Sequence, residues 1–142
     1  MELAYTILNA SVIPFWILLA FFSSKPITQK LLFTYRVHLA LAVFYTLFIV
    51  WGTVENFSGE GGMGSLADLR IAFLNDKVLL AAWAHYLVFD LFVGTWIARK
   101  CLEENIPNAL KWPSLVLTLF FGPIGFLLFT MLKKKTKVEE TV

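Results

Sequence analysis

The feature that most constrains the fold is an apolar stretch that carries two ionisable residues. Residues 78–98 are mostly apolar. As a helix with a rise of about 1.5 Å per residue they span roughly 30 Å, the hydrocarbon thickness of a bilayer. His85 and Asp90 lie well inside this stretch. Because an Asp at that depth costs on the order of 2.5–3.5 kcal/mol on insertion scales, the other helices must supply partners for both side chains.

The composition is that of a membrane protein. The 142 residues are 58% hydrophobic and 15% charged, whereas globular domains are about 45–50% apolar and about 25% charged. A net charge of +2 is too small to indicate a nucleic-acid partner. Cys101 is the single cysteine, which excludes a disulfide framework and a cysteine metal cluster.

The apolar stretches predict an all-α fold, a single-domain integral membrane four-helix bundle. After Ser65, a short amphipathic helix is expected to lie on the membrane surface between the second and third spans, with Asp68 in its first turn. Asn56-Phe-Ser58 matches the glycosylation pattern, which sequences often match by chance. The predicted parts are spans at about 3–22, 31–53, 77–98 and 113–132, a flexible Gly-rich loop at 54–65 and a charged tail at 133–142.

The last apolar stretch contains a conspicuous break. Pro123 removes one backbone hydrogen bond, and Gly122 and Gly125 permit close approach of another helix or a flat ligand. Either the segment crosses the membrane or it re-enters at Gly122-Pro123. We expect it to cross, with Pro113 at the first helical position, which puts both termini on one side.

Four crossings leave the orientation undecided, because each face then carries six Lys and Arg residues. These are Lys25, Lys30, Arg36, Arg99, Lys100 and Lys111 on one face, and Arg70, Lys77, Lys133, Lys134, Lys135 and Lys137 on the other.

If the second and third spans are antiparallel, the depth of each residue below one membrane face can be counted along both. This count places the buried polar groups in two layers. His38 and Asp90 lie ~10 Å and ~13 Å from one face, and Tyr45 and His85 both lie ~21 Å from it. We therefore expect Asp90 to face the second span, with the polar partners Arg36 and His38, or its own-helix neighbour Tyr86, within hydrogen-bonding reach.

These polar groups allow two interpretations. In the structural one, they form buried pairs that fix helix packing. In the functional one, they line a pocket near the midplane, roofed by Trp83 and Tyr86, that binds an elongated apolar ligand while His85 and Asp90 move protons. A metal site built from His38, His85, Asp90 and Glu55 is not predicted, because the ligand spacings are absent. No Ser or Cys lies beside a His, which excludes nucleophilic catalysis.

Two sequence blocks resemble a known family. Trp83-Ala-His85-Tyr-Leu-Val-Phe-Asp90-Leu-Phe-Val-Gly94, followed by Phe121-Gly-Pro-Ile-Gly-Phe126, is similar to the abscisic-acid-deficient-four-like family. These are small integral membrane proteins of plant plastids, algae and bacteria, and the plant members are described as neoxanthin synthases. The resemblance implies isomerisation of a carotenoid epoxide without a cofactor. His85 and Asp90 would be the acid/base pair, and the substrate contacts would be Trp83, Tyr86, Tyr45, Gly122 and Gly125.

The same resemblance leaves a second function open, a non-catalytic structural or pigment-binding subunit of a membrane complex, such as a photosynthetic one. The chain starts directly at its first apolar stretch with no Arg/Ser-rich transit segment, which favours a bacterial member in the inner membrane. Expected partners are the lipid bilayer, a carotenoid or isoprenoid ligand, and further copies or other subunits, but not nucleic acid.

Overall fold

The computed structural model describes residues 1–55 and 61–139, and this part of the chain is all helical, without strands. Four of its helical segments are long and apolar enough to span a membrane, which confirms the predicted class. The elements are α1 (Glu2–Phe21), α2 (Pro26–Thr28), a π-helical turn η1 (Gln29–Phe33), α3 (Arg36–Glu55), α4 (Leu66–Ala72), α5 (Asp76–Glu103) and α6 (Asn108–Glu139).

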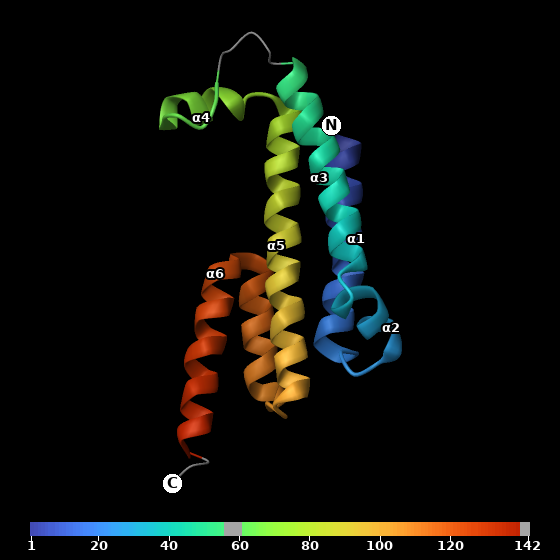
Figure 1. The fold of residues 1–142 in the computed structure, drawn as a ribbon, viewed down its shortest axis with the longest axis vertical. Helices are drawn as coiled ribbons and strands as arrows, with labels where there is room; N and C mark the ends of the chain where they lie inside the picture. The colour runs from blue at the N-terminus through green and yellow to red at the C-terminus, as the bar shows by residue number, and fades with distance from the viewer. Residues whose placement is uncertain (56–60, 140–142) are drawn as a thin grey trace.

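Helix α5 is the centre of the fold and packs against α1, α3 and α6 (Figure 1). Its first turn is capped by the Asn75 side chain, whose Oδ1 accepts hydrogen bonds from the backbone N–H groups of Lys77 and Val78. Such a cap satisfies donors that have no partner inside the helix. The cap explains why α5 begins at Asp76, although most of its stability must come from its packed faces.

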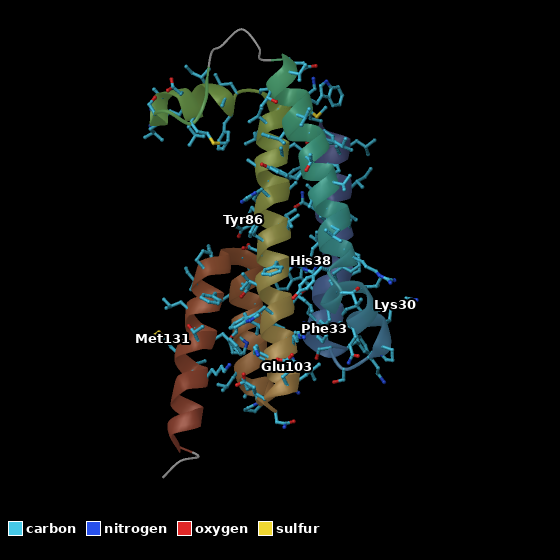
Figure 2. All side chains as sticks on the ribbon, in the orientation of Figure 1. Lys30, Phe33, His38, Tyr86, Glu103 and Met131 are labelled. Carbon is cyan, nitrogen blue, oxygen red and sulfur yellow. The ribbon has the colours of Figure 1, made fainter. Side chains whose placement is uncertain are left out.

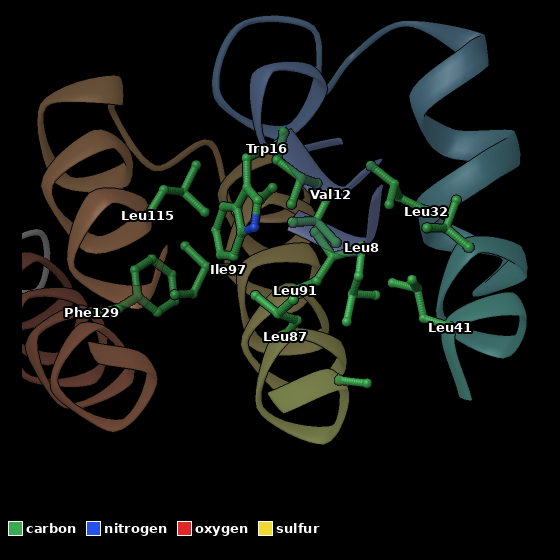
Figure 3. Close-up of a cluster of buried hydrophobic side chains, with 14 of the residues drawn as sticks. Leu8, Val12, Trp16, Leu32, Leu41, Leu87, Leu91, Ile97, Leu115 and Phe129 are labelled. Carbon is green, nitrogen blue, oxygen red and sulfur yellow. The ribbon is translucent and has the colours of Figure 1, made fainter. Parts of the chain in front are cut away.

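The hydrophobic core lies between α5 and the helices around it. Figure 3 shows Trp16 of α1 in one cluster with Leu91 and Ile97 of α5 and Leu115 of α6. Gly94 is what lets Trp16 approach α5, because a Cβ at this glycine would lie 2.6 Å from the indole ring. The close contact of α1 with α5 therefore depends on a residue without a side chain.

The second long helix starts later than the predicted span at residues 31–53. Tyr35 has a φ of +60°, in the left-handed region that side chains other than glycine rarely adopt, and α3 begins at the next residue. The preceding polar segment, expected to be a connection, is itself helical in α2 and η1. The Tyr35 ring stacks on Phe92 of α5 with centroids 5.5 Å apart, which holds the break against the bundle.

Helix α4 has the predicted cap, since the Ser65 Oγ accepts a hydrogen bond from the Asp68 backbone N–H at 3.1 Å. It lies across the direction of α3 and α5 at the end of the molecule that holds the N-terminus (Figure 1). The Asn56–Ser58 pattern, with residues 56–60 of the predicted loop and residues 140–142 of the tail, lies outside the described residues.

The last apolar segment differs most from the expectation of a straight crossing. Helix α6 consists of two helical arms joined at Phe121, whose φ of −148° and ψ of 66° are not helical. In the second arm, the Lys133 Nζ lies 2.7 Å from Oε1 of Glu104, which follows α5 directly. The segment therefore turns back to the end from which it started, as Figure 1 shows. The two arms form a hairpin, the shape that the re-entrant alternative requires, and the described chain begins and ends at opposite ends of the molecule.

The connection before α6 is also shorter than predicted. Helix α5 continues to Glu103 and α6 begins at Asn108, so most of the stretch between the predicted spans at 77–98 and 113–132 is helical. Pro113 lies inside α6 rather than at its first position. Asn105 makes the turn with a φ of +54°, which asparagine tolerates better than most residues.

The hairpin changes the charge count on which an orientation would be predicted. Because Lys133 lies at the same end as Glu104, seven described Lys and Arg residues lie there, against Arg70 and Lys77 beside α4. By the positive-inside rule we expect this end to face the cytoplasm. The seven are Lys25, Lys30, Arg36, Arg99, Lys100, Lys111 and Lys133.

We expect single cysteines to report this topology in intact cells. In a Cys101→Ala background, a cysteine at Met63, which is 91% exposed, should react with a membrane-impermeant maleimide. Cysteines at Lys25 and Lys133 should react only after the membrane is opened. Labelling of positions 63 and 133 from the same side would show that the last segment crosses the membrane.

Candidate functional site

Asp90 is the central side chain of the candidate site. It is 6% exposed and points from α5 to the tip of the α6 hairpin. The carboxylate lies so close to Gly122 that a Cβ at this glycine would overlap its Oδ1, and the Gly122 backbone and the Tyr86 side chain interact with it. Oδ2 of Asp90 is buried without a hydrogen-bond partner among the described residues. A buried carboxylate oxygen without a partner is costly, which makes Asp90 a candidate binding or reacting group.

The expectation that Asp90 faces the second span is wrong, although one of its three expected partners is correct. Tyr86 is close, whereas Arg36 is exposed at the start of α3. The His38 Nε2 lies 3.2 Å from Oγ1 of Thr95, on another face of α5 (Figure 2). The layer of Arg36 and His38 with Asp90 therefore does not form.

Tyr86 and Trp83 extend the site along α5. The Tyr86 hydroxyl donates a 2.6 Å hydrogen bond to the Phe120 carbonyl, and Figure 2 shows Tyr86 beside the tip of the hairpin. Its ring stacks on Trp83 with centroids 5.2 Å apart, and the Trp83 Nε1 donates to the Asn9 Oδ1 of α1 at 3.0 Å. Sequence reasoning missed the roles of Phe120 and Asn9, although a lone Asn inside an apolar span signals a hydrogen-bond partner on another helix.

The two glycines of the hairpin have different neighbours. Gly122 borders Asp90, whereas a Cβ at Gly125 would overlap Oγ1 of Thr118 and lie 2.6 Å from the Ser114 carbonyl, both in the first arm. Gly125 thus lets the two arms of α6 pack closely. The role of Gly125 as a substrate contact, which the resemblance implies, stays a prediction.

His85 lies apart from Asp90. Five residues along a helix correspond to about 140° of rotation and ~7.5 Å of rise, so the two side chains leave α5 in different directions. The His85 ring stacks on Phe89 with centroids 4.5 Å apart, and the Tyr45 centroid is 5.6 Å away. The layer of Tyr45 with His85 is therefore confirmed, but the structure does not bring His85 and Asp90 together as a pair.

Two cavities border these side chains. The larger, of about 490 Å³, lies between α3, α4 and α5 and has His85 and Tyr45 in its wall. The smaller, of about 340 Å³, lies between the first residues of α1 and of α5 and reaches Trp83. The larger volume is in the range of small-molecule sites, about 300–1,000 Å³.

The described residues contain no group of three His, Cys, Asp or Glu side chains that could hold a metal ion. The chemistry offered near Asp90 is thus that of a carboxylate and a phenol in apolar surroundings, groups suited to proton transfer.

Comparison with known proteins gives one match. The family model described as ABA DEFICIENT 4-like matches residues 3–129, from α1 into the second arm of α6. No curated protein and no solved structure matches the chain. The matched range covers most of the 142 residues and includes every candidate site residue discussed above.

Proposed function

This chain belongs to the ABA DEFICIENT 4-like family, and we propose that it binds an elongated carotenoid or related isoprenoid in the membrane and isomerises it by acid–base chemistry at Asp90. The observation that carries the proposal is the buried carboxylate with one oxygen left without a partner. The aromatic rings of Trp83 and Tyr86 beside it offer a flat apolar surface, which suits a polyene.

The proposed reaction needs one base and one acid. In the isomerisation of a carotenoid epoxide to an allenic alcohol, a base removes a proton from carbon, a carbon–oxygen bond opens, a new double bond forms, and the oxygen takes up a proton. No electrons are exchanged with another reactant. The Asp90 carboxylate is the proposed base.

The nearest acid is the Tyr86 hydroxyl, one helical turn away on α5. In the structure this hydroxyl donates to the Phe120 carbonyl. It would exchange that bond for one to the epoxide oxygen when substrate binds. Because His85 leaves α5 in another direction, we assign it to ligand binding away from the reacting atoms.

A specific observation favours the alternative, a non-catalytic subunit. The contact of Asp90 with Gly122 also fixes the tip of the hairpin, which is a sufficient structural reason for the carboxylate. Exposed aromatic side chains on α5 and α6, such as Phe89, Phe120 and Trp112, offer surface for another subunit as well as for lipid.

The first experiment is to purify the protein in mild detergent, record its visible absorption spectrum and identify the extracted lipids by mass spectrometry. We expect a stoichiometric isoprenoid, and conversion of an added carotenoid epoxide to an isomer of the same mass. A colourless protein that holds no ligand, catalyses no conversion and elutes within a larger complex would instead support the structural subunit.

A further inference from the structure

The cavity beneath α4 is separate from the contacts of Asp90. It has a volume of about 490 Å³, and each of the three surrounding helices contributes to its wall: Tyr45 and Ile49 from α3, Leu69 and Ala72 from α4, Val78 and His85 from α5. Most of these side chains are apolar, so the cavity favours a ligand that is itself largely apolar.

Two polar side chains in this wall lack hydrogen-bond partners. In residues 1–55 and 61–139, no hydrogen bond occupies the Tyr45 hydroxyl or the His85 ring, although their rings lie 5.6 Å apart. Thr53, also in the wall, already donates to the Ile49 carbonyl at 2.8 Å. A phenol and an imidazole can together donate to and accept from one ligand hydroxyl.

The charge of the wall limits the class of ligand. Its described residues include no Lys, Arg, Asp or Glu. Lys77 at the start of α5 is paired with Glu55 and lies over the Trp51 ring, 4.2 Å from its centroid. Because an anionic headgroup would have no free cation to meet in the wall, the cavity suits a neutral polar group.

We propose that the cavity beneath α4 binds the hydroxyl-bearing end of a neutral isoprenoid, with Tyr45 and His85 as its hydrogen-bond partners. The inference rests on the proposed function for the isoprenoid class. The cavity would be a second point of attachment for the ligand. His85 is one residue before Tyr86 in the sequence and lies about 7.5 Å along α5 from Asp90. A ligand held at this end would reach the reacting group by following the α5 surface ~7.5 Å along the helix axis and about 140° around it.

The test uses the full-length protein in phosphatidylcholine nanodiscs and three photoreactive probes with the same C15 chain: farnesol, farnesene without the hydroxyl, and farnesyl phosphate. We expect farnesol to label peptides from α3, α4 and α5 that line the cavity, about fivefold more than farnesene does, as the loss of one hydrogen bond implies. Tyr45→Phe should lower farnesol labelling by a similar factor.

Tyr35→Phe is the matched control, because it removes a phenol hydroxyl just before α3, outside the cavity wall and away from Asp90, and it should leave farnesol labelling unchanged. Equal labelling by farnesol and farnesene would overturn the proposal and make the cavity a space for lipid chains. Preferential labelling by farnesyl phosphate would overturn the inference that the cavity binds a neutral isoprenoid. Asp90→Asn separates the two proposals, since it should stop isomerisation while farnesol labelling persists.

Discussion

Replacing Asp90 by Asn should lower the rate of carotenoid isomerisation by about 10²–10⁴-fold, the usual contribution of a general base. An amide of nearly the same shape can still accept a hydrogen bond from the Gly122 backbone, but it cannot take a proton from carbon. Stability should fall only modestly, since the contact with the hairpin remains. Product formation would be followed by chromatography, and folding by thermal unfolding in detergent.

Asp76→Asn is the control for the loss of a carboxylate from α5, because Asp76 is exposed at the first position of the helix and away from the hairpin. It should retain full activity. An Asp90→Asn protein that isomerises at the normal rate would assign Asp90 a packing role. So would one that is less stable but whose folded form still isomerises at an unchanged rate. Because kcat/KM measures transition-state stabilisation, the loss should appear in kcat/KM as well as in kcat if Asp90 acts as the base.

The class of the fold and its best-defined local elements could be predicted from the sequence. The central α5 follows from a long apolar stretch, and α4 follows from a Ser65 cap ahead of Asp68. Both depend on interactions within a few residues of each other, which a sequence displays directly.

The α6 hairpin depends on contacts between distant residues. Gly122 and Pro123 are compatible with a kinked crossing as well as with a turn back. What distinguishes the two outcomes is the approach of the arms at Gly125 and Thr118 and the ion pair of Lys133 with Glu104. Neither contact can be read from hydropathy, which is the same for a straight and a folded segment.

The direction in which Asp90 points cannot be predicted from the sequence for a related reason. Counting residues from the membrane face gives depth, and depth correctly paired Tyr45 with His85. It carries no information on rotation about the helix axis. Thr95 lies on the α5 face that contacts His38. It is five residues from Asp90, which is about 140° of rotation around the helix, and Asp90 points to α6 instead.

Gly122→Ala should destabilise the protein by about 1–3 kcal/mol, the usual cost of inserting a methyl group into a packed interior, and should also abolish isomerisation. The added Cβ would overlap the buried Asp90 carboxylate, which has little room to move. The midpoint of thermal unfolding in detergent measures the first effect, and product formation measures the second.

Gly64→Ala is the matched control, because Gly64 is exposed and the nearest atom to the Cβ it would add, Oδ2 of Asp68, lies 3.4 Å away at an ordinary contact distance, so it should leave both stability and activity unchanged. Combining Gly122→Ala with Asp90→Ala removes the overlap, so the double variant should lose less stability than the sum of the two single losses. Such coupling would show that Gly122 acts on Asp90 directly. Strict additivity would place the cost of Gly122→Ala in the turn of the hairpin itself, and the carboxylate would then owe its position to α5 alone.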